Sequence, residues 1–136
     1  MKHFILVIAV LLTLFLQGCA EPPYTNISND EFANLKAQGV AVFDIRRPEE
    51  WKQTGVVDGS KTLTAFDKSG RFNPAFLSTF ASEVSPEQSV ILICRTGNRT
   101  SALAKFLAEK QGYSKVYNVS NGITSWIREG RPVNKS

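Results

Sequence analysis

A cysteine stands between a buried apolar run and a helical pattern. Cys94 follows Val90-Ile91-Leu92-Ile93 and begins the segment Cys94-Arg95-Thr96-Gly97-Asn98-Arg99, after which residues Thr100 to Gln111 have a helical pattern. A thiol in a short loop at a helix N-terminus, beside two arginines, lies in a positive field that favours the thiolate. This placement predicts that Cys94 is a sulfur nucleophile and that its substrate is an anion.

The residues that follow the cysteine suit the binding of an anion. Gly97 permits a backbone twist that turns N–H groups inward, and the small side chains of Thr96 and Asn98 leave room for a ligand. The two arginines add positive charge to the backbone donors. The expected substrate-binding residues are Arg95, Thr96, Gly97, Asn98 and Arg99, with Thr100 in support at the start of the helix.

The first residues of the chain have the pattern of an export signal. Lys2 precedes an apolar stretch from Phe4 to Leu16, which is shorter than the roughly 20 residues of a membrane-spanning helix. Cleavage behind this stretch would remove His3, the one histidine of the chain. The mature protein would then lack the base of Cys–His catalysis and the commonest metal ligand, so we expect neither a metal nor a cofactor.

The end of that stretch resembles the lipobox of bacterial lipoproteins. The residues are Leu16-Gln17-Gly18-Cys19. The resemblance implies that residues 1–18 are a signal peptide, that Cys19 carries a lipid, and that residues 19–26 form a lipidated tether. An ordinary signal peptide and an uncleaved anchor are the alternatives. With Cys19 acylated, Cys94 has no disulfide partner, and such a lone thiol either has a function or is buried and inert.

Strand and helix patterns alternate over residues 27–133, the expected single domain. The expected strands are Val40–Ile45, Lys61–Leu63, Val90–Cys94 and Lys115–Val119. The expected helices run from a capping box at Ser28 to Gly39, from Pro48 to Gly55, from Asn73-Pro74 onward, from Thr100 to Gln111 and through Ile123–Ile127 to Gly130. This order predicts an α/β fold with a mainly parallel central sheet covered by helices on both faces. Ligands of such folds bind beyond the carboxyl ends of the strands, where Cys94 lies.

Four segments, taken together, resemble the rhodanese-type sulfurtransferases. Cys94 to Ala102 resembles the active-site loop of that family and the start of the helix after it. Asp44 to Trp51 resembles the family pattern D-[VI]-R-x-P-x-E-[WYF], and Gly55 to Ser60 resembles G-H-I-x-G-A. Tyr117 to Trp126 resembles Y-x-L-x-G-G-x-x-x-W. The resemblance implies a rhodanese-like fold and transfer of sulfur from a donor such as thiosulfate to cyanide or a thiol through a Cys94 persulfide. It also implies that Asp44 and Arg46 brace the loop.

Two residues depart from the family pattern. Val56 stands where the family usually has histidine, and Asn121 stands where it has glycine. The histidine position looks structural in the family, so the substitution bears on local packing rather than on chemistry. Asparagine tolerates positive φ better than most residues, so we expect the turn at Asn121 to form.

Two other functions compete with sulfur transfer. A phosphatase or arsenate reductase of the same fold has a loop one residue longer, whereas here four residues separate Cys94 from Arg99, a spacing that suits a single sulfur atom. A non-catalytic rhodanese-like module that binds a partner is the second alternative, and the intact cysteine loop disfavours it.

The predicted leader and the net charge indicate where the protein is located and what it binds. The net charge of +4 suits small anions but is too small to indicate nucleic-acid binding. We expect a monomer, held by the lipid on Cys19 to the periplasmic side of the cell envelope. Ala20 lacks the aspartate that marks inner-membrane retention in some lipoproteins, which favours the outer membrane if the source is Gram-negative.

Overall fold

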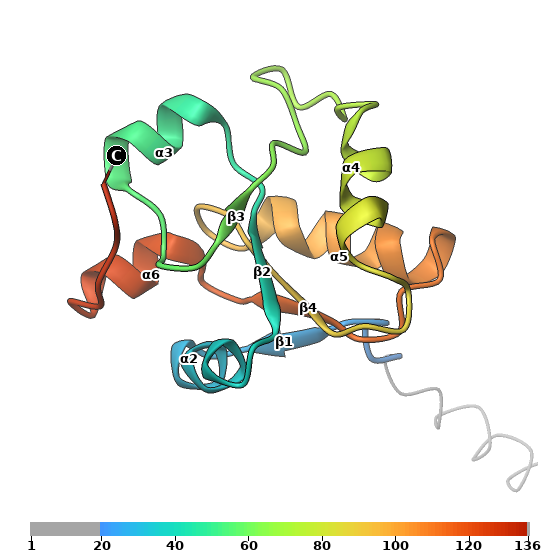
Figure 1. Cartoon of the computed structure of the whole chain (residues 1–136), viewed down its shortest axis with the longest axis horizontal. Coiled ribbons are helices and arrows are strands. Elements are labelled where there is room, and N and C mark those ends of the chain that lie inside the picture. Colours follow the sequence, from blue (N-terminus) through green and yellow to red (C-terminus); the bar gives the residue numbers. More distant parts are fainter. Residues whose placement is uncertain (1–19, 136) are drawn as a thin grey trace, which may run out of the picture.

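The computed structural model describes residues 20–135 of the chain (Figure 1). The predicted signal peptide, residues 1–18, and the predicted lipid attachment at Cys19 lie outside the described residues. Between residues 20 and 135, no helix is both long and apolar enough to cross a membrane.

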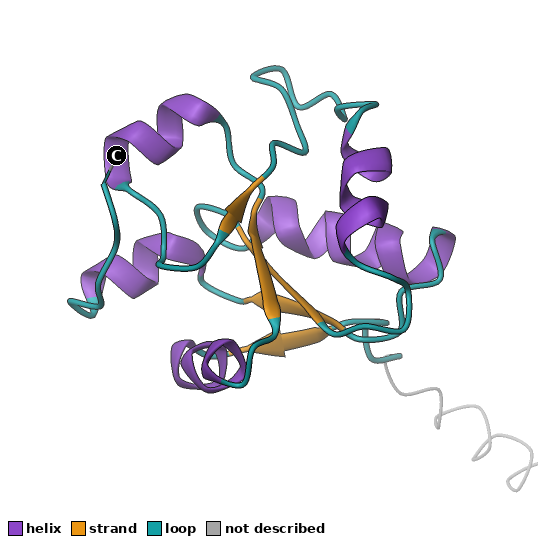
Figure 2. Ribbon diagram, viewed as in Figure 1, coloured by secondary structure: helices purple, strands orange, loops and turns teal. Residues whose placement is uncertain are grey.

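Parallel strands and helices alternate along the described chain (Figure 2). In chain order they are β1 (Thr25–Ile27), α2 (Asn29–Ala37), β2 (Ala41–Asp44), α3 (Pro48–Thr54), β3 (Lys61–Thr62), α4 (Phe76–Glu83), β4 (Val90–Ile93), α5 (Asn98–Lys110), β5 (Val116–Val119) and α6 (Gly122–Arg128). The strands form one sheet in the order β1-β5-β4-β2-β3, and every neighbouring pair is parallel. Parallel pairing requires crossover connections, and the helices supply them.

Helices cover both faces of the sheet, as predicted (Figure 1). Because strand side chains alternate, β4 divides its four buried residues between two apolar clusters. Val90 and Leu92 pack with residues of α4 and α5, whereas Ile91 and Ile93 pack with residues of α2 and α6. Burial on both faces explains why β4 is the most continuous apolar run of the chain.

Most predicted elements are confirmed, with shifted ends. The capping box of α2 is present, since the Glu31 N–H donates to Ser28 Oγ at 3.2 Å and the Ser28 N–H donates to Glu31 Oε1 at 3.1 Å. Helix α4 begins at Phe76, not at the predicted Asn73-Pro74. Helix α5 begins at Asn98 rather than at Thr100, and its N-cap is Gly97, which provides no side-chain cap.

Strand β1 is an element that the sequence did not predict. Thr25 and Asn26 were assigned to the tether, but they pair with Tyr117 and Asn118 of β5 at the edge of the sheet. Three residues are too few for a side-chain alternation to be recognised, and only Ile27 of the three is buried. The sheet therefore begins inside the segment that was expected to be a linker.

The two departures from the family pattern have different outcomes. The backbone of Val56 pairs with the C-terminal segment, through hydrogen bonds of 2.9 and 2.7 Å with Asn134, and Figure 1 shows that segment beside the end of α3. The turn at Asn121 forms, as expected, but positive φ is not needed at that residue, whose φ is −109°. The next residue, Gly122, adopts the left-handed conformation with φ +62°.

Candidate active site

The Cys94 thiol lies at the carboxyl edge of the sheet, where β4 leads into the loop before α5. The residue is 1% exposed and packs among the apolar residues beneath α5. The Gly97 N–H donates a hydrogen bond to Cys94 Sγ at 3.2 Å, and the Thr100 hydroxyl oxygen lies 3.2 Å from the same sulfur. The loop thus wraps polar groups around an otherwise buried sulfur atom.

The backbone around the sulfur offers unused hydrogen-bond donors. The N–H groups of Thr96, Asn98, Arg99 and Thr100 donate no hydrogen bond to any residue between 20 and 135. The first N–H groups of a helix have no intrahelical partner and, with the helix dipole, form a binding site for anions. Helix α5 has 13 residues, so its dipole is fully developed at this end. The loop can therefore hold a negatively charged sulfur species.

Two glycines fit this loop against the turn between β5 and α6. Gly97 has φ +92° and Gly122 has φ +62°, a region that favours glycine. A Cβ atom on Gly97 would overlap the carbonyl oxygen of Ser120, and one on Gly122 would overlap that of Arg95. Backbone N–H groups at the start of α6 donate to the carbonyls of Cys94 and Arg95 at 2.9 and 3.1 Å. The turn thus fixes the loop from behind.

The Arg99 guanidinium is engaged by a carboxylate of α3. Its two terminal nitrogens donate to the two oxygens of Glu50, at 2.8 and 2.7 Å. Partial burial acts to raise the pKa of Glu50, but hydrogen bonds from Arg99 and from the Arg47 N–H, with the charges of both arginines, lower it from 4.5 to about 2. The hydrogen bonds with Glu50 raise the pKa of Arg99, and the negative charge of Cys94 would raise it further. Arg99 is therefore a fixed positive charge near the sulfur.

Asp44 and Arg46 form a buried ion pair behind α3. Arg46 donates to Asp44 at 2.8 Å and to the Thr54 hydroxyl at 2.8 Å, and the indole N–H of Trp51 donates to Asp44 at 3.1 Å. Both charged side chains are almost completely buried. Their partners lie on and after α3 rather than in the loop, so they support the loop indirectly, by holding the helix that carries Glu50.

The other predicted binding residues lie at the rim. The exposed ones are Arg95, Thr96 and Asn98. Arg95 forms no ion pair with the described residues, whereas Asn98 and Arg99 line a cavity of about 440 Å³ together with Phe66 and Lys68. Among the described residues, the groups that contact Cys94 Sγ by hydrogen bonds are the Gly97 N–H and the Thr100 hydroxyl, not these side chains at the rim.

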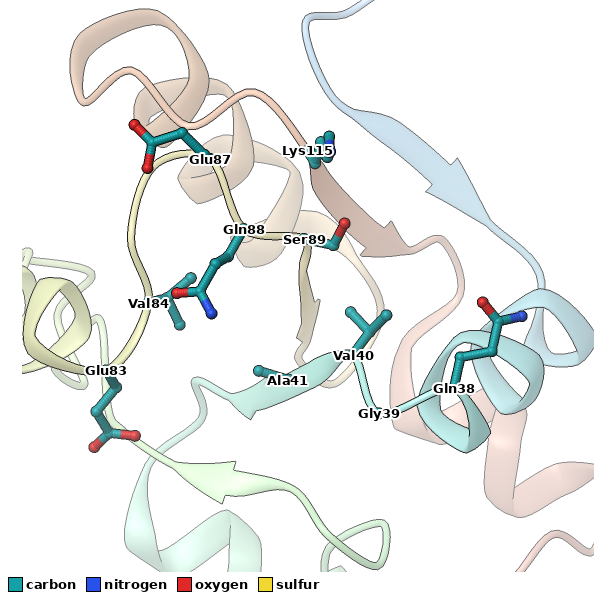
Figure 3. A pocket seen from close by; sticks show the side chains of 10 residues that line it. All are labelled: Gln38, Gly39, Val40, Ala41, Glu83, Val84, Glu87, Gln88, Ser89 and Lys115. Carbon is teal, nitrogen blue, oxygen red and sulfur yellow. The ribbon is translucent and has the colours of Figure 1, made fainter.

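A second cavity lies at the opposite edge of the sheet (Figure 3). It has a volume of about 370 Å³ and is lined by residues at the starts of strands, among them Ala41, Ser89 and Lys115. Cys94 follows the other end of β4, so this cavity contains none of the predicted site residues. No group of three or more potential metal ligands occurs among residues 20–135.

Several residues of this site had no functional role predicted from the sequence. They are Glu50, Trp51, Thr54 and Asn118. Glu50 belongs to the recognised motif from Asp44 to Trp51, but its partner, Arg99, is 49 positions away in the sequence. Asn118 is buried, with 2% exposure, and the available signal was a polar residue inside an otherwise apolar strand.

Comparisons with known proteins identify the family of this chain. The rhodanese-like domain family matches residues 28–129, and the chain belongs to that family. A thiosulfate sulfurtransferase GlpE from Pseudoalteromonas translucida is 30% identical over 92 residues, which cover 68% of this chain and 77% of the relative. A sulfurtransferase from Allochromatium vinosum is 30% identical over 96 residues, 71% of this chain and 79% of the relative.

Solved structures show the same fold. The crystal structure of a rhodanese-related protein from Thermoplasma volcanium matches with a TM-score of 0.63 and 30% identity, covering 83% of this chain and all of the other. The chain is thus a rhodanese-like domain whose relatives include proteins named as sulfurtransferases.

Proposed function

We propose that this protein transfers a sulfane sulfur from a small anionic donor such as thiosulfate to a thiophilic acceptor, cyanide or a thiol, through a Cys94 persulfide. The observation that carries the proposal is the position of Cys94 Sγ, 3.2 Å from the Gly97 N–H at the start of α5. The unpartnered loop amides around it suit the negative charge that a persulfide carries. The names of the two sulfurtransferase relatives point the same way.

The first half-reaction forms the persulfide. The Cys94 thiolate attacks the outer sulfur of thiosulfate, a new S–S bond forms at Sγ, and the S–S bond of thiosulfate breaks. Sulfite leaves with the electron pair of that bond, and the terminal persulfide sulfur retains a negative charge. Loop N–H groups and the fixed charge of Arg99 stabilise this anion electrostatically.

The second half-reaction returns the thiolate. Cyanide or a thiolate attacks the terminal persulfide sulfur, the bond to Sγ breaks, and Cys94 keeps its electron pair as the thiolate. Cyanide becomes thiocyanate, and a thiol becomes a persulfide. Because the sulfur passes through the enzyme, the kinetics should be ping-pong.

Thiocyanate formation from thiosulfate and cyanide tests the proposal. Cys94→Ser should abolish turnover, and Thr100→Val, which removes the hydroxyl beside the sulfur, should reduce it. Ser101→Ala is the matched control, because its hydroxyl bonds to the Asn98 carbonyl in the next position of the same helix. Equal rates for Cys94→Ser and the unaltered protein would refute sulfur transfer at this residue.

Two further assays separate the competing functions. Hydrolysis of an aryl phosphate by the unaltered protein but not by Cys94→Ser would favour a phosphatase, and reduction of arsenate would favour an arsenate reductase. The absence of turnover with any sulfur donor, together with binding of a partner protein that survives Cys94→Ser, would favour a non-catalytic module. The short loop and the almost complete burial of Cys94 favour a small sulfur donor over these substrates.

We also propose that the protein is a lipoprotein of the cell envelope. The support is the Leu16-Gln17-Gly18-Cys19 sequence after an apolar stretch. The lipid would hold a monomeric domain on the periplasmic side, at the outer membrane if the source is Gram-negative. Incorporation of labelled palmitate that is lost in Cys19→Ser would support acylation, whereas a full-length chain that starts at Met1 in the mature protein would refute it.

A further inference from the structure

A chain of buried polar groups leads from the sulfur away from the substrate loop. The hydroxyl oxygen of Thr100 lies 3.2 Å from Cys94 Sγ and 2.5 Å from Asn118 Oδ1. The Asn118 amide nitrogen lies 3.0 Å from the side-chain oxygen of Asn26 in β1 and 3.4 Å from the Gly97 carbonyl. Cys94, Thr100 and Asn118 are each at most 2% exposed, so these groups have to satisfy one another.

The orientation of the Asn118 amide follows from its neighbours. The Gly97 carbonyl can only accept a hydrogen bond, so the atom of Asn118 that faces it is the NH₂ group. The oxygen then faces Thr100. The separation of 2.5 Å is within the range for an O–H···O bond and is too short for an N–H···O bond, which leads to the same assignment.

The Thr100 hydroxyl has a single proton, and three acceptors lie within reach of it. Asn118 Oδ1 is the nearest at 2.5 Å, whereas the Gly97 carbonyl and Cys94 Sγ are both at 3.2 Å. The proton therefore goes to Asn118, and the lone pairs of the hydroxyl are left to face the sulfur. In that arrangement Thr100 accepts a hydrogen bond from a Cys94 thiol and cannot donate one to a thiolate.

We infer that Asn118 is a positioning residue that keeps the Thr100 hydroxyl turned away from Cys94, so that the sulfur lacks one of the donors that could stabilise its thiolate. Rotation of the hydroxyl from Asn118 to the sulfur would add a second donor beside the Gly97 N–H and so favour ionisation. Such a restraint protects a lone cysteine, because oxidation proceeds from the thiolate. Because the proposed sulfur transfer needs the Cys94 thiolate, this role rests on the proposed function.

The charged groups around the loop are separate from this chain of hydrogen bonds. They are Asp44 at the end of β2, Arg46 after that strand, Glu50 on α3, Arg95 in the loop, Arg99 on α5 and Arg128 on α6. None of them has a hydrogen bond with Thr100 or Asn118 among the described residues. Substitution of Asn118 by an uncharged residue leaves all of these charges in place, so a change in the ionisation of Cys94 can be traced to the hydroxyl.

The test is the rate of Cys94 alkylation by iodoacetamide as a function of pH, measured on the full chain with the label located by peptide mass. Asn118→Leu should leave the Gly97 carbonyl and the sulfur as acceptors for the Thr100 proton, both at 3.2 Å. Because a charged thiolate is the stronger acceptor, the midpoint pH should fall by about one unit, which corresponds to roughly tenfold faster alkylation at low pH. Asn118→Asp should raise the midpoint, because a carboxylate holds the hydroxyl more strongly and repels a thiolate. Asn26→Ala, which leaves the bond between Thr100 and Asn118 intact, is the matched control and should not change it.

A double-mutant cycle distinguishes this role from a purely structural one. In a Thr100→Val background, Asn118→Leu should no longer shift the midpoint, because no hydroxyl remains to be released. A shift that persists there, or shifts of the same sign in Asn118→Leu and Asn118→Asp, would overturn the inference. Thermal unfolding of each variant verifies that it is folded. If a variant of Asn118 does not fold, Asn118→Thr takes its place. The midpoint pH should again be lower in Asn118→Thr, because the new threonine hydroxyl can donate to the Thr100 hydroxyl.

The alkylation assay does not depend on sulfur transfer. If the unaltered protein transfers no sulfur but the midpoints move as expected, the proposed function fails and the role of Asn118 stands. If sulfur is transferred and the midpoints do not move, the role of Asn118 fails alone.

Discussion

Replacement of Glu50 by glutamine should weaken the fold in a pH-dependent way. Glutamine retains the hydrogen bond from the Arg47 N–H that caps α3 but removes the charge that binds the Arg99 guanidinium. The pKa of Glu50 is lowered from 4.5 to about 2, and each unit corresponds to about 1.4 kcal/mol. The full decrease is therefore equivalent to about 3 kcal/mol. Since the Arg99 side chain is 25% exposed, solvent screening reduces the expected loss at pH 7 to about 1–2 kcal/mol.

The pH dependence has a definite direction. Because folding lowers the pKa of Glu50, its contribution is complete above the unfolded value of 4.5 and is lost as the pH falls through the folded value of about 2. The difference in unfolding free energy between the unaltered protein and Glu50→Gln should thus fall to less than about half between pH 7 and pH 3.

Urea unfolding, followed by tryptophan fluorescence at the two pH values, measures this difference. Glu49→Gln is the control, because Glu49 pairs with Arg47 on the surface with its side chain 54% exposed, and its loss should leave the unfolding free energy unchanged. A difference for Glu50→Gln that is the same at pH 7 and pH 3 would show that the charge of Glu50 is not the source of the stabilisation.

Two other substitutions test the parts that hold the loop. Gly97→Ala should lower the melting temperature more than Gly112→Ala. Both residues have positive φ, +92° and +74°, but of the two only Gly97 places the new Cβ against a neighbour, the Ser120 carbonyl. Equal decreases would argue against this collision. Arg46→Met should cost about 3–5 kcal/mol in urea unfolding, because it leaves the Asp44 carboxylate buried without its partner; a loss below about 1 kcal/mol would argue that the pair does not stabilise the site.

Local sequence patterns were sufficient for most of the fold. The runs that became β2, β4 and β5 are apolar because helices cover the sheet on both faces, and the capping box at Ser28 marks the start of α2. Strand β1 was not predictable in this way, because it has three residues and owes its existence to pairing with β5, about 90 positions later.

The site shows the same division between local and long-range information. The position of Cys94 at a strand end before a helix could be predicted from neighbouring residues alone. The contact of Thr100 with Asn118 depends on the register between β4 and β5, in which Leu92 lies opposite Asn118, and no local pattern encodes a register. The pairing of Glu50 with Arg99 likewise depends on the packing of α3 against the loop.

The turn at Asn121 shows how a sound local rule can be applied to the wrong residue. Asparagine does tolerate positive φ, but the chain places that conformation one residue later, at Gly122, where a side chain would overlap the Arg95 carbonyl. A tight contact with a distant segment decided the conformation.

The mass of the intact protein before and after incubation with thiosulfate tests the central claim most directly. We predict a gain of one sulfur atom, reversed by cyanide and absent in Cys94→Ser. No gain of mass with any sulfur donor, or a gain that persists in Cys94→Ser, would contradict it.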